Sequence, residues 1–332
     1  MTNSTEAWLD AYQWLCRCRR NAPANADVWH LRYHWATQGM RLLEHVCSGQ
    51  YRLSPMLVHR QGQDSWAQWC ASDALVLKWV ALQVGQDLPI HQRCAHTQGH
   101  GGVRGSITAV AACLNSETWR FVYRTDIRGY YRHIRKQQVL SQINWHVQSP
   151  ILRDLLKQYL YYSVEDGGEI HTPITGISRG CALSPLIGAS LLHHVDSYFA
   201  SREEIFYARY MDDFLLFTRT RWSLRRMVKQ LSTFFDLGGF SPHPDKTQVG
   251  KIEHGFDWLG LWFGPEGPTI APRALENHRA RRVRLYEQAR RKRLSATETD
   301  VLVQTYEARW HRWADGMLTA GRISAAEDII CL

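Results

Sequence analysis

Two adjacent aspartates, Asp212 and Asp213, lie between two apolar runs, residues 205–210 and 214–218. Runs of this length and composition predict two strands joined by a tight turn. Like charges at the tip of such a turn disfavour each other's ionisation, so the pair is costly unless cations neutralise it. A divalent metal site is one explanation of the pair. An ordinary hairpin with solvated aspartates is the other.

A third carboxylate, Asp126, closes an alternating segment, residues 119–126, that is typical of a strand. A carboxylate where a buried strand meets a loop is well placed to be held rigidly while it faces a cleft. Its structural alternative is a helix N-cap for the segment after Gly129. Two-metal phosphoryl transfer needs oxygen ligands around ions roughly 3.5–4 Å apart. Asp126, Asp212 and Asp213 together would supply that set.

The elements that would position these carboxylates alternate between helix and strand. Four glycines in residues 98–105 are costly in a helix and in a strand, so a loop is expected there. Residues 1–65 look mainly helical. Periodicity further predicts helices over 73–84 and 222–237, two helices within 129–163, and short strands over 247–252, 256–263 and 268–271.

Composition indicates a globular chain with a polyanionic partner. The 332 residues are 45% hydrophobic and 21% charged, which excludes disorder as the main state, and the net charge is +9. Eight cysteines without a Cys-x-x-Cys pair predict mostly buried free thiols in a reducing compartment. No apolar run has the length of a bilayer span and the N-terminus lacks signal-peptide features, which predicts a cytoplasmic protein without membrane contact.

Five sequence blocks occur in the order and approximate spacing of reverse transcriptases. They are Asp-x-x-Gly-Tyr-Tyr at 126–131, Gly-Ile-Ser-Arg-Gly-Cys-Ala-Leu-Ser-Pro-Leu at 176–186, Tyr-Met-Asp-Asp at 210–213, His-Pro-Asp-Lys-Thr at 243–247 and Phe-Asp-Trp-Leu-Gly at 256–260. Over residues 70–320 the chain most resembles bacterial enzymes related to those of group II introns, including defence-associated ones. The resemblance implies an α+β right-hand polymerase fold. Its expected parts are a short helical N-terminal extension (1–65), fingers (66–118), a palm with inserted fingers helices (119–271) and a basic helical thumb (272–332).

The resemblance also implies a role for each matching residue. Asp126, Asp212 and Asp213 would bind two Mg²⁺ ions, with Mn²⁺ as the alternative metal. Lys246 would protonate the leaving pyrophosphate, and Tyr131 would exclude the 2′-hydroxyl of a ribonucleotide. The structural alternatives are a core aromatic for Tyr131 and solvated charges for Arg104 and Lys246. The nucleotide is expected to contact Arg104, Arg179 and Gly180. The primer end is expected to contact Trp258, Leu259 and Gly260. The nucleic-acid backbone is expected to contact Arg279, Arg282 and Arg290 of the basic stretch 273–293.

One block departs from the family pattern. Ser178 and Arg179 stand where intron and retroviral relatives have Pro and Gln, so fidelity, nucleotide preference or priming mode is expected to differ. The thumb is expected to end near residue 320, which leaves no length for an RNase H or endonuclease domain.

The implied function is RNA-directed DNA synthesis from dNTPs. The implied template is a structured non-coding RNA in an anti-phage system, with DNA as the product. A retron-type or domesticated group II intron enzyme, an RNA-templated RNA polymerase and a non-catalytic RNA-binding scaffold are the alternatives. The sequence leaves the priming mechanism and the oligomeric state open.

Overall fold

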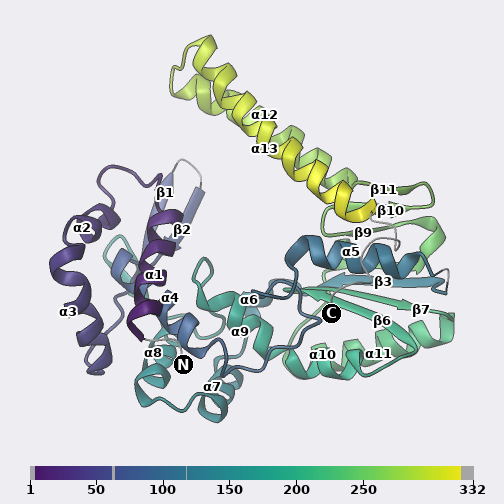
Figure 1. Cartoon of the computed structure of the whole chain (residues 1–332), viewed down its shortest axis with the longest axis horizontal. Helices are drawn as coiled ribbons and strands as arrows, with labels where there is room; N and C mark the ends of the chain where they lie inside the picture. The colour runs from purple at the N-terminus through teal and green to yellow at the C-terminus, as the bar shows by residue number, and fades with distance from the viewer. Residues whose placement is uncertain (1–3, 62–63, 117, 323–332) are drawn as a thin grey trace. The chain divides into compact units, whose positions relative to one another are not determined.

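The periodic segments of the sequence fold into helices and strands close to the expected ranges. A computed structural model describes residues 4–61, 64–116 and 118–322 (Figure 1). The chain divides into two units, each discontinuous in sequence. Unit 1 comprises residues 1–91, 129–194 and 236–240, and unit 2 comprises residues 92–128, 195–235 and 241–332. The expected subdomain boundaries at 65, 118 and 271 describe a different division of the chain and stay predictions.

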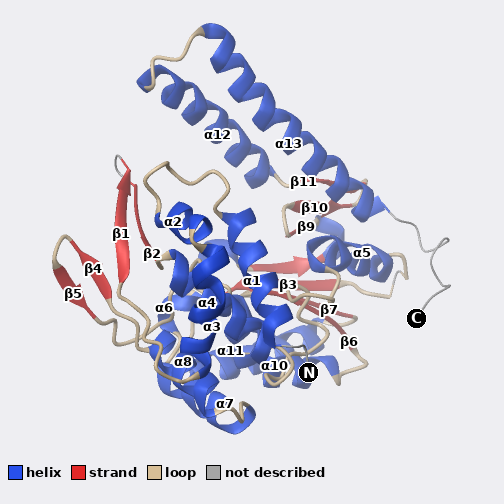
Figure 2. Ribbon diagram, turned by 60° about the vertical axis from the view of Figure 1, so that its left-hand side comes forward, coloured by secondary structure: helices blue, strands red, loops and turns tan. Residues whose placement is uncertain are grey.

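Unit 1 consists mainly of helices with one small mixed sheet (Figure 2). In this sheet the strand order is β2-β1-β4-β5, and β1 pairs antiparallel with β2 but parallel with β4. The elements are α1 (Ser4–Cys18), α2 (Asp27–Tyr33), α3 (Trp35–Cys47), β1 (Met56–Gln61), β2 (Asp64–Gln68), α4 (Ala71–Val84), α6 (Tyr130–His133), α7 (Lys136–His146), α8 (Pro150–Leu160), β4 (Val164–Asp166), β5 (Glu169–His171) and α9 (Leu183–Leu191).

The helix expected over 73–84 is confirmed as α4, a central helix of unit 1. It begins at Ala71, because the thiol of Cys70 accepts a hydrogen bond from the backbone N–H of Asp73 and so caps the first turn. α4 contacts α1, α8 and α9, and its Leu75 and Leu77 side chains are fully buried. A helix covered on several sides needs apolar residues around most of its circumference, which explains this segment's composition.

Two stretches of the chain differ from the sequence expectation. The helical expectation for residues 1–65 is wrong at Met56–Gln61, which form β1. β1 pairs over five positions with β2, its neighbour in the sequence, and over two positions with β4, so its conformation depends mainly on a local pairing that the sequence expectation missed. The loop expected over 98–105 is wrong from Gly102 onward, where α5 begins. Gly101 takes the left-handed conformation at the N-cap (φ 82°), and burial of the following helix offsets the cost of its glycines.

Unit 2 contains the antiparallel sheet that carries the paired aspartates, with strand order β6-β7-β3-β8. A second sheet, β11-β10-β9, and the helices α5 and α13 share one core with it, which includes Val122, Leu215, Trp258 and Met317. The elements are α5 (Gly102–Leu114), β3 (Phe121–Asp126), most of α10 (His193–Ala200), β6 (Ile205–Tyr210), β7 (Asp213–Thr218), most of α11 (Arg221–Gly238), η1 (Pro244–Lys246), β8 (Gln248–Lys251), η2 (Ile252–His254), β9 (Phe256–Trp258), β10 (Leu261–Gly264), β11 (Gly267–Ile270), α12 (Pro272–Arg291) and α13 (Ala296–Arg322).

The basic stretch after β11 forms a helical hairpin. In both views α12 and α13 lie side by side (Figures 1 and 2), and Leu285 and Ala289 are the buried residues of α12. Almost all charged residues of α12 are exposed. The C-terminal part of this hairpin packs on the core, because α13 contacts α5 and β11.

The cysteines within the described residues are free, as expected, but most of these are not buried. Of the seven in the described part of the chain, only Cys94 and Cys181 are buried, whereas Cys18 and Cys47 are exposed. Cys331 lies outside the described residues. A search for bilayer-spanning helices over the same described residues finds none with the required length and apolar character.

Candidate active site

The sheet of unit 2 places the aspartates from two segments of the chain next to each other. β3 pairs antiparallel with β7, and the register sets Asp126 directly opposite Asp213. Asp212 lies in the turn before β7, and its carbonyl oxygen accepts a hydrogen bond of 3.1 Å from the N–H of Ile127. The predicted strand–turn–strand at 205–218 is therefore confirmed, and its tip adjoins the end of β3.

The turn itself requires an unusual backbone conformation at Met211, whose φ is 55°. A non-glycine residue rarely adopts this left-handed region, so its surroundings must stabilise it. Nδ1 of His96 accepts a hydrogen bond from the N–H of Met211 at 3.0 Å, and Nη1 of Arg209 donates to the Met211 carbonyl at 2.7 Å. Both backbone polar groups of Met211 are thus bound by side chains from unit 2.

The arginine that holds this turn belongs to a buried ionic network. Arg209 and Asp196 are fully buried, and the guanidinium contacts both carboxylate oxygens at 2.6 and 2.5 Å. Tyr207 donates a third hydrogen bond, of 2.5 Å, to Asp196. Burial and then the Asp196 charge raise the pKa of Tyr207 well above its usual value, so the phenol remains a donor. A buried ion pair needs such additional hydrogen bonds to offset its desolvation.

The sequence pattern alone does not predict Asp196, Arg209 or His96 as residues of the site. The available signal was an arginine inside the apolar run 205–210, because a charge buried in a sheet needs a partner. Which residue partners it, and that it binds Met211, follows only from the folded structure.

Two cations lie against the carboxylates of Asp126 and Asp213. Asp126 is buried and forms an ion pair with Nζ of Lys246, and Nη2 of Arg124 lies 3.0 Å from Oδ1 of Asp213. Burial, opposed by Arg124 and assisted by the charges of Asp126 and Asp212, raises the pKa of Asp213 to about 6. Burial is therefore the main reason that Asp213 is harder to ionise than a solvated carboxyl group.

The donor set suits divalent cations. Carboxylate oxygens are the ligands that Mg²⁺ and Mn²⁺ prefer. Within the described residues the three carboxylates do not already form a coordination shell, since Asp126 and Asp213 face Lys246 and Arg124. Beside them, and again among the described residues, Nδ1 of His243 and Nε of Arg124 are buried without a hydrogen-bond partner.

The other predicted residues of unit 2 are distributed over several elements. Lys246 lies at the carboxylates, on η1, and its carbonyl accepts from Nη1 of Arg124 at 2.8 Å. Trp258 is a core residue whose Nε1 donates to Ser106, and Leu259 and Gly260 form a turn with positive φ. The guanidinium of Arg104 lies against Gly316 of α13. On α12, Arg279, Arg282 and Arg290 are exposed, and Arg282 pairs with Glu307 at 2.7 Å.

Three predicted nucleotide-contacting residues belong to unit 1. Tyr131 lies on α6 with its ring against Gly188 of α9, and its carbonyl accepts a 2.9 Å hydrogen bond from the N–H of Ile177. This bond brings Tyr131 together with the segment that includes Arg179 and Gly180, both of which are exposed. Their action on a nucleotide stays a prediction.

Comparison with solved structures finds telomerases at low identity. Telomerase from Candida albicans, solved with the TWJ fragment of telomeric RNA, is 14% identical, with 68% of this chain and 47% of that chain covered and a TM-score of 0.49. Apo telomerase from Candida tropicalis truncated from its C-terminal domain is 14% identical over 58% of this chain and 43% of that one, with a TM-score of 0.44. The chain thus spans less than half the length of these telomerases. No curated protein matches.

A comparison with protein families matches more than half of the chain. The family described as reverse transcriptase (RNA-dependent DNA polymerase) matches residues 86–263, a range that contains all three aspartates and Lys246. This match agrees with the order of the blocks in the sequence and with the pairing of Asp126 with Asp213. The chain therefore belongs to the reverse transcriptase family.

Proposed function

We propose that Asp126, Asp212 and Asp213 hold two Mg²⁺ ions and form the catalytic centre for extension of a primer on an RNA template. The register that sets Asp126 opposite Asp213, with Asp212 in the adjoining turn, is the observation that carries the proposal. The bound ions would activate the primer 3′-hydroxyl and stabilise charge on the leaving pyrophosphate. The buried network of Arg209, Asp196 and His96 would fix the turn and so the direction of both its carboxylates.

Lys246 has a second part in this proposal. Its ammonium lies at Asp126 and is partly exposed, with 27% of the side chain accessible. Once the carboxylate is engaged elsewhere, the ammonium is free to donate a proton to the leaving pyrophosphate oxygen. On this proposal the Lys246–Asp126 pair keeps the proton donor beside the reaction centre before substrates arrive.

Primer extension with dNTPs on an RNA template tests the proposed function. The wild-type chain should give extended product, and the double variant Asp212→Asn with Asp213→Asn should give none while it still binds RNA. Activity that survives in the double variant would remove the aspartates from catalysis. RNA binding without polymerase activity in either protein would favour the non-catalytic scaffold.

The biological role that we propose is synthesis on a dedicated non-coding RNA in an anti-phage system, in the cytoplasm. It is supported by the resemblance of the sequence blocks to defence-associated bacterial enzymes. Sequencing of the RNA that co-purifies with the protein tests it. One abundant structured RNA encoded beside the gene is expected, whereas intron RNA would favour a domesticated group II intron enzyme.

A further inference from the structure

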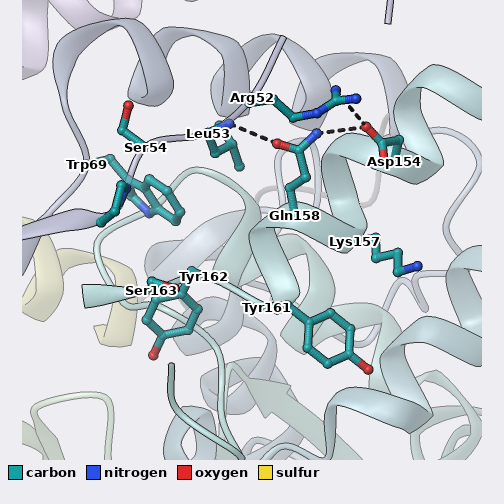
Figure 3. A pocket seen from close by; sticks show the side chains of 11 residues that line it. Arg52, Leu53, Ser54, Trp69, Asp154, Lys157, Gln158, Tyr161, Tyr162 and Ser163 are labelled. Carbon is teal, nitrogen blue, oxygen red and sulfur yellow. Dashed lines mark hydrogen bonds and ion pairs between the residues drawn. The ribbon is translucent and has the colours of Figure 1, made fainter. Parts of the chain in front are cut away.

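Unit 1 contains a pocket of about 390 Å³ that has no part in the proposed catalytic centre (Figure 3). It lies between the segment before β1, the helix α8 and residues 161–163, so all its walls belong to one unit. This volume is within the range of small-ligand sites.

Three aromatic rings line the pocket. Figure 3 shows Trp69, Tyr161 and Tyr162 around one part of it, with Arg52 and Asp154 on the opposite part. Trp69 is almost fully buried, and its Nε1 donates to Oγ of Ser178 at 3.2 Å. The ammonium of Lys136 lies 5.3 and 5.1 Å from the ring centroids of Tyr161 and Tyr162, which steadies both rings.

The polar wall is formed before any ligand binds. The side chain of Gln158 accepts a 2.8 Å hydrogen bond from the N–H of Leu53 and donates to the carbonyl of Tyr51 at 3.2 Å and to Asp154 at 2.7 Å. These bonds fix the chain before β1 against α8. The walls of the pocket are therefore already ordered, and binding of a ligand would cost little conformational entropy.

Two cations and one carboxylate line this aromatic pocket: Arg52, Lys157 and Asp154. Arg52 lies 3.4 Å from Asp154, and 65% of its side chain is exposed. Lys157 is also exposed, and its ammonium forms no hydrogen bond or ion pair with the described residues. Flat rings next to solvent-facing cations match the two parts of a nucleotide, since bases stack on aromatic rings and phosphates pair with Lys and Arg.

We propose that this pocket binds one unpaired nucleotide of single-stranded RNA, with the base on the tyrosine rings and a phosphate at Lys157 and Arg52. The choice of RNA depends on the proposed function; the nucleotide chemistry depends on the pocket alone. Two features favour a strand over a free nucleotide. The pocket opens onto exposed residues, with Tyr161 43% exposed, and Trp69 bonds to Ser178, next to Arg179 and Gly180, which are expected to contact the nucleotide during synthesis.

Fluorescence anisotropy with a short single-stranded RNA tests the proposal. Tyr161→Ala should weaken binding about 5- to 100-fold, because a stacked base is lost, and Tyr161→Phe should bind like the wild type. Lys157→Ala should reduce the slope of log K against log salt by about 0.7. Tyr33→Ala and Arg41→Ala, at other exposed positions of the same unit, should leave both quantities unchanged. Melting temperatures verify that all variants fold.

Three outcomes would overturn this assignment. One is wild-type RNA affinity in both Tyr161→Ala and Lys157→Ala. Another is micromolar binding of free AMP that Tyr161→Ala abolishes while RNA affinity persists, which would assign the pocket to a free nucleotide. The third is equal weakening by Tyr33→Ala. Binding measured in the Asp212→Asn, Asp213→Asn background keeps this test independent of catalysis, because RNA affinity can depend on Tyr161 whether or not the aspartates polymerise.

Discussion

Two regions of unit 2 contain arginines in opposite surroundings. At the aspartate turn, Arg209 is fully buried, contacts both oxygens of Asp196 and holds the carbonyl of Met211. On α12 the arginines are exposed, and Arg282 forms an ion pair at the surface with Glu307. Breaking a buried ion pair costs about 3–5 kcal/mol, whereas an exposed pair contributes about 0–1 kcal/mol. Burial, not residue type, decides whether one arginine is indispensable.

The largest effect is expected at the carboxylates that the buried region positions. Asp126→Asn should lower the rate of primer extension by roughly 1,000-fold or more, because it removes a charged ligand of the catalytic ions. The measurement is single-turnover extension on an RNA template, with Glu253→Gln as the exposed control. A loss below tenfold would show that Asp126 is not a ligand.

The buried network should come next in size. Asp196→Asn should lower the free energy of unfolding by about 3–5 kcal/mol, because the Arg209 charge stays buried without its partner. Denaturant unfolding measures it, and Arg226→Gln, from the exposed pair with Glu204, should cost less than about 1 kcal/mol.

A double variant separates the stability of this network from its positioning role. Asp196→Leu with Arg209→Met should recover most of the lost stability, because apolar residues of similar volume replace a buried ion pair well. Its kcat should stay below the wild-type value, because Arg209→Met removes the donor to the Met211 carbonyl. Recovery of both quantities would mean that the network only stabilises the fold.

Tyr131 extends the comparison to an uncharged, half-buried side chain. Tyr131→Ala should raise incorporation of ribonucleotides relative to deoxynucleotides by roughly tenfold or more, because the proposed steric exclusion of the 2′-hydroxyl is removed. Competing incorporation of rNTPs and dNTPs measures it, with Tyr130→Phe as the control at the neighbouring core position. Unchanged selectivity would place the gate elsewhere.

The smallest effect per residue is expected on α12. Arg279→Ala with Arg290→Ala should leave the unfolding free energy within about 0.5 kcal/mol of the wild type, as exposed substitutions do. Affinity for a primer–template duplex should fall, and the slope of log K against log salt should decrease by about 0.9 for each lost phosphate contact. Salt titrations of binding measure the slope. An unchanged slope would make these arginines a solvated face only.

Much of this architecture could be predicted from sequence, for identifiable physical reasons. Strands β6 and β7 are apolar runs with the two aspartates where they meet, so the local pattern is enough to predict both strands and the turn. The helix α4 was equally clear, because its apolar residues are consecutive. Asp212 and Asp213 are recognisable because adjacent like charges between apolar strands need a compensating cation, and Asp126 because it ends a strand.

The remainder depends on pairings between residues that are distant in sequence. The position of β4 beside β1 is one such pairing, and the N–H of Met211 finds its acceptor in His96. The choice of Asp196 as the partner of Arg209 likewise depends on how α10 packs on β6. No pattern in a single sequence specifies these contacts, although the buried arginine marked the place where one was needed.

The most direct test of the account is Mn²⁺ binding measured by electron paramagnetic resonance. The complex would contain a primer without a 3′-hydroxyl, an RNA template and the next dNTP. The wild type is predicted to bind Mn²⁺ in excess of that held by the nucleic acid and dNTP alone. Asp126→Asn and Asp212→Asn should each abolish that excess, because both strands contribute to one site. Wild-type binding in Asp126→Asn would contradict the shared site.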